Sequence, residues 1–227
     1  MFAAVMAHAM GVKIENIRQG LRTFDATFFQ APGRLNVYDK LPFKVILDYG
    51  HNPAAVRAIG DLVGRLEVSG RRIGVVAAPG DRRDEDIREI ARIAGKAFDH
   101  VILRRDDDRR GRGSEEVPRL MEATLLEEGV PADRITVIID EQAAIDAALK
   151  MGQPGDLLVV FADNTTRSWK QIIYFKGEDG TRPLVSSSPV QVKLAPPVRA
   201  EAVESQLGGT TVIADERGVR LARETDD

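Results

Sequence analysis

Cysteine is absent from the 227 residues of this chain, and histidine occurs only three times. Without cysteine the chain has no disulfide framework, no thiolate nucleophile and no cysteine-ligated zinc or iron–sulfur site. The three histidines, His8, His51 and His100, leave little for a metal site built from several imidazoles. We therefore expect that this chain's own residues hold no metal ion.

Long apolar runs are also missing, and neither sign of charge dominates. An uninterrupted run such as Leu157–Ala162 is far too short to span a bilayer. The apolar opening MFAAVMAHAM lacks a basic segment and continues into GVKIENI, which argues against a signal peptide. The 32 basic residues nearly balance the 35 acidic ones, which does not favour nucleic acid or an anionic membrane as a partner. We expect a cytoplasmic protein that binds neither.

The length and the 43% of hydrophobic residues suit one globular domain, or one domain with an appendage. From residue 34 onward, β-type runs alternate with helical patterns. Strands are expected at 35–38, 43–49, 73–77, 100–103, 135–139 and 156–162. Helices are expected from Pro53, and at 84–97, 114–128 and 141–150. This alternation predicts an α/β fold, a Rossmann-like and mostly parallel sheet flanked by helices with right-handed crossovers.

Capping residues mark two of these helices. Asn52 precedes Pro53, a residue that favours the first helical position, and Ser114 precedes two glutamates that suit a first helical turn. We expect Asn52 and Ser114 to be the N-caps.

The two ends of the chain differ from the middle. Residues 3–10 and 15–24 read as two short helices, and the first begins with no cap, as in a segment cut from something larger. The segment after Phe175 is rich in glycine, proline and serine and predicts an extended tail. Within it, 210–222 is either a hairpin that turns at Glu216–Gly218 or a frayed end.

Polar loops follow four of the predicted strands, at 50–53, 79–84, 106–112 and 163–167. In an open parallel sheet, ligands bind outside the carboxyl ends of the strands. Three of these loops combine guanidiniums, which suit phosphates and carboxylates, with carboxylates, which suit ribose hydroxyls, metals or a cationic substrate. We expect them to form a site for a charged ligand. His51, at a strand end beside Asp48 and Asn52, is the histidine expected to serve it.

Two motifs carry a resemblance to a family. Ala31-Pro32-Gly33-Arg34, followed by Asp48-Tyr49-Gly50-His51-Asn52-Pro53, resembles the start of the C-terminal domain of the Mur ligases. The residues before Ala31 resemble the last two helices of the central ATPase domain of these enzymes. The stretches FDATFFQAPGRLNVYD, RRDDDRRGR and DNTTRSWKQIIYF are most similar to the cyanophycin synthetases of this superfamily. The resemblance covers roughly residues 1–180 and suggests three parts: 1–30 from a central domain, 31–178 as the C-terminal domain, and 179–227 as the tail.

The resemblance implies an activity and a set of partners. Such ligases activate a carboxylate with ATP as an acyl phosphate, which the amine of an amino acid then attacks. Their central domain supplies the P-loop and the Mg²⁺ ligands, and this chain contains no GxxxxGK[ST] motif of its own. It should therefore act with that central domain, be inactive alone, and belong to a homo-oligomer in the intact enzyme.

Individual roles follow from matching positions. Arg34 and Asp48 match positions that contact the nucleotide, and His51 and Asn52 should lie near the phosphates and the acyl phosphate. In cyanophycin synthetases the substrates are arginine and the β-carboxylates of poly-aspartate.

The loop at 106–109 matches the Asp-Asn-Pro-Arg loop that selects the amino acid in related ligases. Arg109, with Arg110 and Arg112 as near alternatives, is expected to bind the α-carboxylate of arginine. The acidic triplet is expected to bind its guanidinium, and consists of Asp106, Asp107 and Asp108. Arg83 and Arg167 are candidates for holding the poly-aspartate backbone.

Two other interpretations stay open. One is a peptidoglycan-type ligase that adds a different amino acid. The other is a non-catalytic module, derived from a ligase lobe, that binds an acidic polymer or a partner protein.

Overall fold

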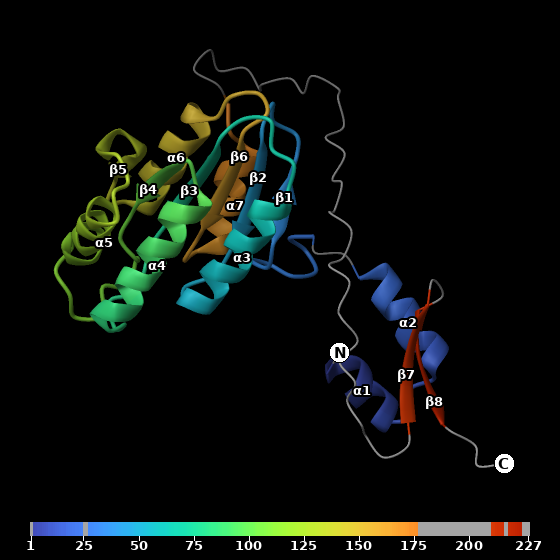
Figure 1. Cartoon of the computed structure of the whole chain (residues 1–227). Coiled ribbons are helices and arrows are strands. Elements are labelled where there is room, and N and C mark those ends of the chain that lie inside the picture. The colour runs from blue at the N-terminus through green and yellow to red at the C-terminus, as the bar shows by residue number, and fades with distance from the viewer. Residues whose placement is uncertain (1, 25–26, 177–209, 216–217, 224–227) are drawn as a thin grey trace. The chain divides into compact units, whose positions relative to one another are not determined.

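The computed structural model describes residues 2–24, 27–176, 210–215 and 218–223 of the chain (Figure 1). The chain divides into two compact units, Met1–Val192 and Lys193–Asp227. The first unit contains a six-stranded sheet in the order β1-β2-β6-β3-β4-β5. These strands are β1 (Asn36–Tyr38), β2 (Lys44–Asp48), β3 (Arg72–Val76), β4 (His100–Leu103), β5 (Ile135–Val137) and β6 (Leu157–Phe161).

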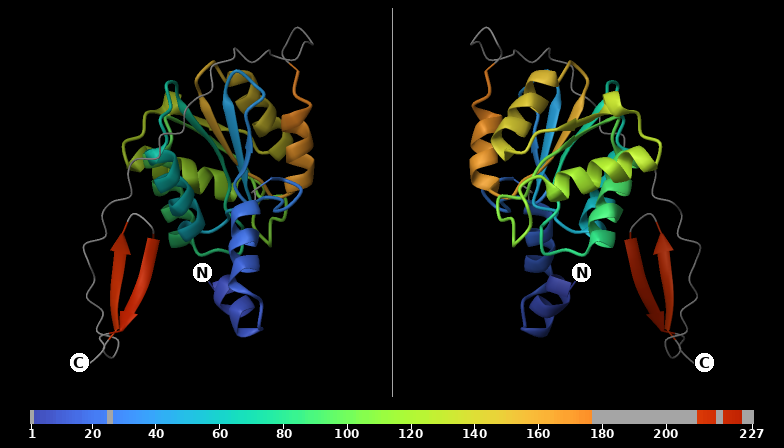
Figure 2. Two further views of the ribbon diagram at one scale, coloured as in Figure 1. Left: turned by 90° about the vertical axis from the view of Figure 1, so that its right-hand side faces the viewer. Right: turned by 90° about the vertical axis from the view of Figure 1, so that its left-hand side faces the viewer.

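All neighbouring strands in this sheet are parallel except β1, which runs antiparallel to β2. Helices cover both faces (Figure 2). The helices on one face are α3 (Pro53–Arg65), α4 (Asp84–Ala97) and α5 (Glu116–Glu127), and those on the other are α6 (Glu141–Met151) and α7 (Thr165–Ile173). The predicted fold class, a mostly parallel α/β sheet flanked by helices, is confirmed.

Strand β6 shows why two cores form. All five of its residues are buried, and they alternate between the faces because successive side chains on a strand point in opposite directions. Val159 and Phe161 join the core under α3, α4 and α5, whereas Leu158 and Val160 join the core under α6 and α7. The continuous apolar run that predicted a strand buried on both faces is therefore correct.

The element boundaries follow the predicted ones within a few residues, with two exceptions. Ser114 does not cap α5: the helix begins at Glu116, with Glu115 in the cap position. The Glu116 carboxylate accepts a hydrogen bond from the amide of Gly113, which lies before the helix, at 3.0 Å. Thr165–Arg167, predicted as loop, is the first turn of α7, and the Asn164 side chain caps it by accepting from the Arg167 amide at 3.0 Å.

Asn52 is the N-cap of α3, as predicted, and its side chain accepts from the Ala55 amide at 2.9 Å. In the second unit, β7 (Thr210–Asp215) and β8 (Gly218–Arg223) pair antiparallel, so the hairpin interpretation is correct and the frayed end is wrong. The predicted turn residue Glu216, like most of the tail predicted at 179–227, lies outside the described residues.

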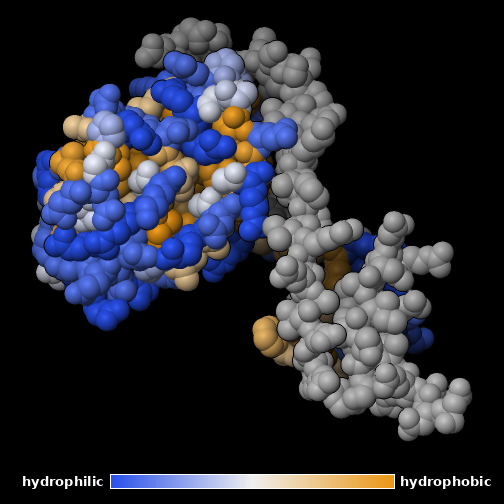
Figure 3. All heavy atoms as spheres, viewed as in Figure 1, coloured by the Kyte–Doolittle hydropathy of each residue, from blue (hydrophilic) through white to orange (hydrophobic). Residues whose placement is uncertain are grey.

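The two N-terminal helices, α1 (Phe2–Ala9) and α2 (Ile14–Thr23), bury none of their residues. Several large apolar side chains there are exposed, among them Phe2, Met6 and Leu21. The sheet domain differs, because hydrophilic side chains cover most of the face seen in Figure 3. Among the described residues, no helix is both long enough and apolar enough to cross a membrane.

Candidate functional site

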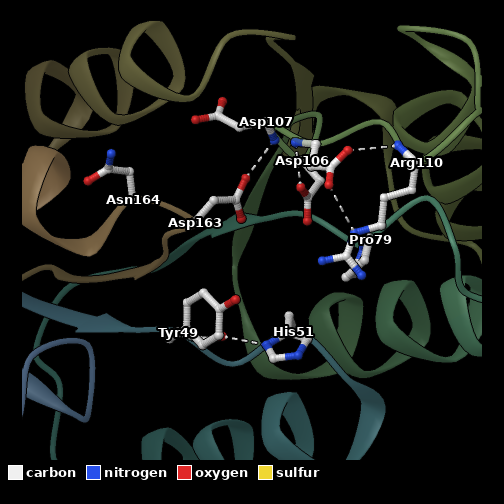
Figure 4. A pocket seen from close by; sticks show the side chains of 9 residues that line it. Tyr49, His51, Pro79, Asp106, Asp107, Arg110, Asp163 and Asn164 are labelled. Carbon is white, nitrogen blue, oxygen red and sulfur yellow. Dashed lines mark hydrogen bonds and ion pairs between the residues drawn. The ribbon is translucent and has the colours of Figure 1, made fainter.

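The loops after β2, β3, β4 and β6 meet in one pocket of about 270 Å³ at the carboxyl edge of the sheet (Figure 4). This confirms that the four polar loops converge. The volume is close to the lower end for small-molecule sites, roughly 300 Å³. The pocket is lined by Tyr49, His51, Pro79, Asp106, Asp107, Asp108, Arg110, Asp163 and Asn164.

The pocket carries an excess of negative charge. Four of its lining residues are aspartates, and Arg110 is its one basic residue apart from His51. Arg110 is itself paired, since its Nη1 lies 2.6 Å from Asp81 and its Nε lies 3.6 Å from Asp108. An excess of carboxylates around a small cavity favours a cationic ligand, above all one with several N–H donors.

Asp106 lies at the base of the acidic wall. It is 8% exposed, and its Oδ1 accepts from the Asp108 amide at 2.8 Å. Burial, together with the negative charge of Asp163, raises the pKa of Asp106 above that of an ordinary aspartate. Among the described contacts Asp106 has no ion pair, so its charge is left for a ligand.

Gly80 and Arg112 set the position of the acidic loop relative to the loop after β3. Arg112 donates to the carbonyls of Gly80 at 2.8 Å and Arg82 at 2.9 Å, and it pairs with Asp84 at 2.7 Å. A Cβ on Gly80 would lie 2.1 Å from the Arg109 carbonyl oxygen, so the two loops touch where a larger residue cannot fit. Arg112, an alternative for binding a carboxylate in the sequence prediction, is thus occupied by protein groups.

Asp163 lies beside Asp107 in the same acidic wall, where its Oδ2 accepts from the Asp107 amide at 2.8 Å, and Arg104 holds it from behind (Figure 4). Arg104 is the residue directly after β4, and its side chain is 1% exposed. Its Nη1 and Nη2 donate to the two oxygens of Asp163 at 2.7 and 2.9 Å. Burial disfavours charge at both groups, yet the hydrogen bonds and opposite charge of the pair lower the pKa of Asp163 and raise that of Arg104.

Behind the acidic wall lies a buried cluster that includes Glu141, the first residue of α6. Its carboxylate has no exposed surface and contacts Arg104 at 3.0 Å and Arg167 at 2.9 Å. Arg167 also reaches forward to Asp107 at 2.6 Å. Burial works against the charge of Arg167, but Glu141 and Asp107 keep the pKa of its guanidinium above the usual value.

A metal ion does not fit this cluster. Asp107, Glu141 and Asp163 each offer an oxygen, and these atoms lie within 4.8 Å of one another. The guanidiniums of Arg104 and Arg167 already contact all three carboxylates, which supplies the positive charge that Mg²⁺ would bring. We therefore assign no metal ion to these residues.

The exit of β2 holds the residues predicted to meet a nucleotide. Arg34 is exposed, and its guanidinium lies 5.7 Å from the centre of the Tyr49 ring. His51 Nδ1 lies 3.0 Å from the Tyr49 carbonyl oxygen. Because a carbonyl oxygen only accepts, Nδ1 carries a hydrogen and Nε2 is the ring nitrogen left for a ligand.

Asp48, which the sequence predicts to contact a nucleotide, is held by two backbone amides in this structure. It is 8% exposed, its Oδ2 accepts from the Leu35 amide at 2.9 Å, and its Oδ1 accepts from the Gly50 amide at 2.7 Å. The carboxylate thus ties the turn before β1 to the exit of β2, and its prominent role in this structure is to shape the loop that carries Arg34.

The predicted site residues fall into two groups. His51 and the acidic triplet line the pocket, whereas Arg109 is exposed outside it and Arg83 pairs with Asp86 on the surface. Asn52 caps α3, and Arg167 lies behind the acidic wall. Of the three arginines considered for the substrate carboxylate, the structure brings Arg110 to the pocket.

Sequence reasoning missed the buried residues Arg104, Glu141 and Ser168. An arginine directly after the apolar run VIL was a signal, because a charge at the end of a buried strand needs a partner. Glu141 and Ser168 gave no such signal, since each suits an ordinary amphipathic helix.

These features define a doubly wound α/β domain with an acidic pocket at the carboxyl edge of its sheet, where ligands bind in folds of this kind. The chain belongs to the Mur ligase family, because residues 33–164 match the family described as "Mur ligase, glutamate ligase domain".

Curated relatives include cyanophycin synthetases. The one from Crocosphaera subtropica is 42% identical over 166 residues, which cover 73% of this chain and 19% of the relative. The one from Nostoc sp. is 37% identical over 221 residues, which cover 96% of this chain and 22% of the relative. The chain thus spans about a fifth of the length of these relatives.

A solved structure shows the same fold. The folylpolyglutamate synthase of Mycobacterium tuberculosis, complexed with ADP and AMPPCP, superposes with a TM-score of 0.53 at 19% identity. The match covers 72% of this chain and 36% of that one.

Proposed function

We propose that this chain is the C-terminal lobe of an ATP-dependent amide ligase of the cyanophycin synthetase type, and that its acidic pocket receives arginine. The observation that carries the proposal is the pocket itself, in which four aspartates outnumber one arginine at the ligand-binding edge of the sheet. The similarity to cyanophycin synthetases supports the choice of reaction.

The side-chain guanidinium of the substrate suits the carboxylates of the acidic wall. Asp106 offers a buried carboxylate without an ion pair, and Asp108 is only loosely paired, at 3.6 Å from Arg110. A guanidinium with five N–H donors can bond both, and its planar fork matches carboxylate geometry. Lysine would present a single ammonium and could not satisfy the two acceptors in the same way.

The α-carboxylate of the substrate needs a cation at the rim. Arg110 lines the pocket, and the exposed Arg109 next to it has no ion pair among the described contacts. We assign the α-carboxylate to these two arginines. The α-amine then attacks the acyl phosphate of an activated β-carboxylate of poly-aspartate, forming the amide and releasing phosphate.

The nucleotide is assigned to the exit of β2. Arg34 presents a free guanidinium over Tyr49, and His51 Nε2 can donate to phosphate oxygens when the ring carries both protons. The P-loop and the Mg²⁺ ligands would come from a central domain. The exposed apolar side chains of α1 and α2 support such a neighbour.

The test compares amino acids as ligands of the chain. Calorimetry with L-arginine, L-lysine and L-aspartate should give the tightest binding for arginine and none for aspartate. A preference for lysine or another amino acid would favour the peptidoglycan-type alternative. Binding of poly-aspartate with no response to any free amino acid would favour the non-catalytic module.

A further inference from the structure

We propose that Glu141 is a positioning residue that holds together the two acidic loops, after β4 and after β6, that present carboxylates to a guanidinium in the pocket. The inference deepens the proposed function and rests on it for the identity of the ligand. Glu141 does not line the pocket, and it lies on α6, outside the four loops that do. Its contacts nevertheless reach both the loop after β4 and the loop after β6.

Each oxygen of Glu141 has two partners. Oε2 contacts Arg104 Nη2 at 3.0 Å and accepts from the Asp163 amide at 2.8 Å. Oε1 accepts from Arg167 Nη2 at 2.9 Å and from the Ser168 hydroxyl at 2.8 Å. A carboxylate bonded in this way on both oxygens has one orientation, so it serves as a fixed point for the segments around it.

The contacts close a cycle through both loops. Arg104 holds the Asp163 carboxylate, whose Oδ2 also accepts from the Asp107 amide at 2.8 Å. The Asp107 side chain then pairs with Arg167 at 2.6 Å, and Arg167 returns to Glu141. The loop after β4 and the loop after β6 are therefore joined twice, once in front through Asp163 and once behind through Glu141.

The charges explain why Glu141 is needed. Without the charge of Glu141, the two guanidiniums would be paired with the pocket carboxylates, Arg104 with Asp163 and Arg167 with Asp107. Asp107 would then have to balance the positive charge of Arg167, and Asp163 that of Arg104. Less negative charge would remain at the pocket for a cationic ligand. Glu141 neutralises the two arginines from the buried side and leaves the acidic wall available to a cationic ligand.

The chain offers a matched control in Asp156, at the amino end of β6. Asp156 is also buried, pairs with Arg71 at 2.7 Å, and accepts from the amides of Arg71 at 2.7 Å and Gln153 at 3.0 Å. Glu141→Gln and Asp156→Asn each remove one buried, arginine-paired charge, and both should lower stability. They differ in that the described side-chain partners of Asp156, Arg71 and Gln153, do not line the pocket.

The experiment measures L-arginine binding by calorimetry, and hydrogen exchange at the Asp107 and Asp163 amides by NMR, in the complete chain. Glu141→Gln should weaken arginine binding by about tenfold or more, as residues behind a binding site commonly do, and speed exchange at both amides. Asp156→Asn should leave the affinity for L-arginine within about twofold of the wild-type value, because distant sites contribute independently. Ser168→Ala, a milder change inside α7, should shift both readouts in the direction of Glu141→Gln and covers the case in which that variant fails to fold.

Equal affinities in wild type, Glu141→Gln and Ser168→Ala, with unchanged exchange at both amides, would overturn the positioning role and leave the proposed function standing. Failure of the wild-type chain to bind arginine would count against the proposed function. The hydrogen-exchange data alone would then decide whether Glu141 is a positioning residue. Faster exchange at Asp107 and Asp163 in Glu141→Gln but not in Asp156→Asn supports positioning. Equal exchange rates at these amides in Glu141→Gln and Asp156→Asn would contradict the positioning role.

Discussion

Arg104 and Asp163 meet through two parallel hydrogen bonds, of 2.7 and 2.9 Å, at the carboxyl ends of β4 and β6. Such a two-point pair is directional as well as strong, so it fixes the Asp163 carboxylate in the wall of the pocket. The pair is also the point where the fold and the site depend on each other. Loss of either partner would leave the other charge buried and poorly compensated.

Arg104→Met should therefore destabilise the domain by about 3–5 kcal/mol, the cost of removing one partner from a buried pair. Urea unfolding followed by circular dichroism measures this loss. Arg119→Met is the comparison, because Arg119 pairs with Glu115 at the surface, where both side chains are more than half exposed (57% and 56%), and its removal should cost clearly less. Equal losses in the two variants would contradict the importance assigned to burial at Arg104.

Asp106→Asn should stabilise the folded domain at neutral pH while it weakens arginine binding. The pKa of Asp106 is raised in the folded state, so the folded chain binds more protons than the unfolded chain between the two pKa values. Stability from this group is therefore greatest in acid and is lost as pH rises through the raised pKa. Asp106→Asn removes this loss of stability at higher pH. Thermal unfolding measured at a series of pH values would show the difference from wild type.

Asp163 should behave in the opposite way. Its pKa is lowered in the folded state, so its contribution is present above the ordinary aspartate pKa and is lost as pH falls through the lowered value. In Asp163→Asn the stability curve should lose this acid-side decline, provided the variant folds. A decline of unchanged size would show that other carboxylates dominate acid unfolding.

Gly80→Ala should destabilise the domain by about 1–3 kcal/mol, because the added Cβ overlaps the Arg109 carbonyl oxygen and forces the two loops apart. Arginine binding should weaken in the same variant. Gly64→Ala is the control: it lies in α3 with open space around its Cβ, and should raise stability by about 0.4–1 kcal/mol. If Gly80→Ala were neutral, the close contact between the loops would not be a constraint.

His51→Ala should abolish arginine-dependent ATP turnover in the intact ligase with little effect on folding. Its side chain lines the pocket, and among the described contacts its hydrogen bond is a local one, to the Tyr49 carbonyl. Asp48→Asn is a poorer probe of the same role, because Asp48 also holds the amides of Leu35 and Gly50 and its loss should lower stability. Full turnover by His51→Ala would remove this residue from the nucleotide site.

The sequence was sufficient to predict the sheet, because β6 and its neighbours are apolar runs of the right length between helical patterns. It also predicted which loops converge, since parallel strands bring their carboxyl ends to one edge. Asn52 and Pro53 located the start of α3 to the residue. The first turn of α7 was missed because Thr165 and Thr166 are weak helix formers, and the Asn164 cap is what starts that helix.

The details of the site were harder to predict because they depend on contacts between distant residues. Nothing near Glu141 in the sequence indicates that it meets Arg104 and Arg167, which lie 37 residues before it and 26 residues after it. Arg109 and Arg110 are neighbours of the same type, and the turn at Arg110, with φ of +49°, decides which of them lines the pocket. Asp48 was predicted from its motif, but its two backbone amide partners became visible only in the fold.

The decisive measurement for the acidic pocket is a calorimetric titration of the chain with L-arginine, repeated with L-lysine and with the Asp106→Asn variant. We expect arginine to bind more tightly than lysine, and Asp106→Asn to lose most of the arginine affinity while it remains folded. Equal binding of arginine and lysine, or arginine binding that Asp106→Asn leaves unchanged, would contradict the assignment of this pocket to a guanidinium.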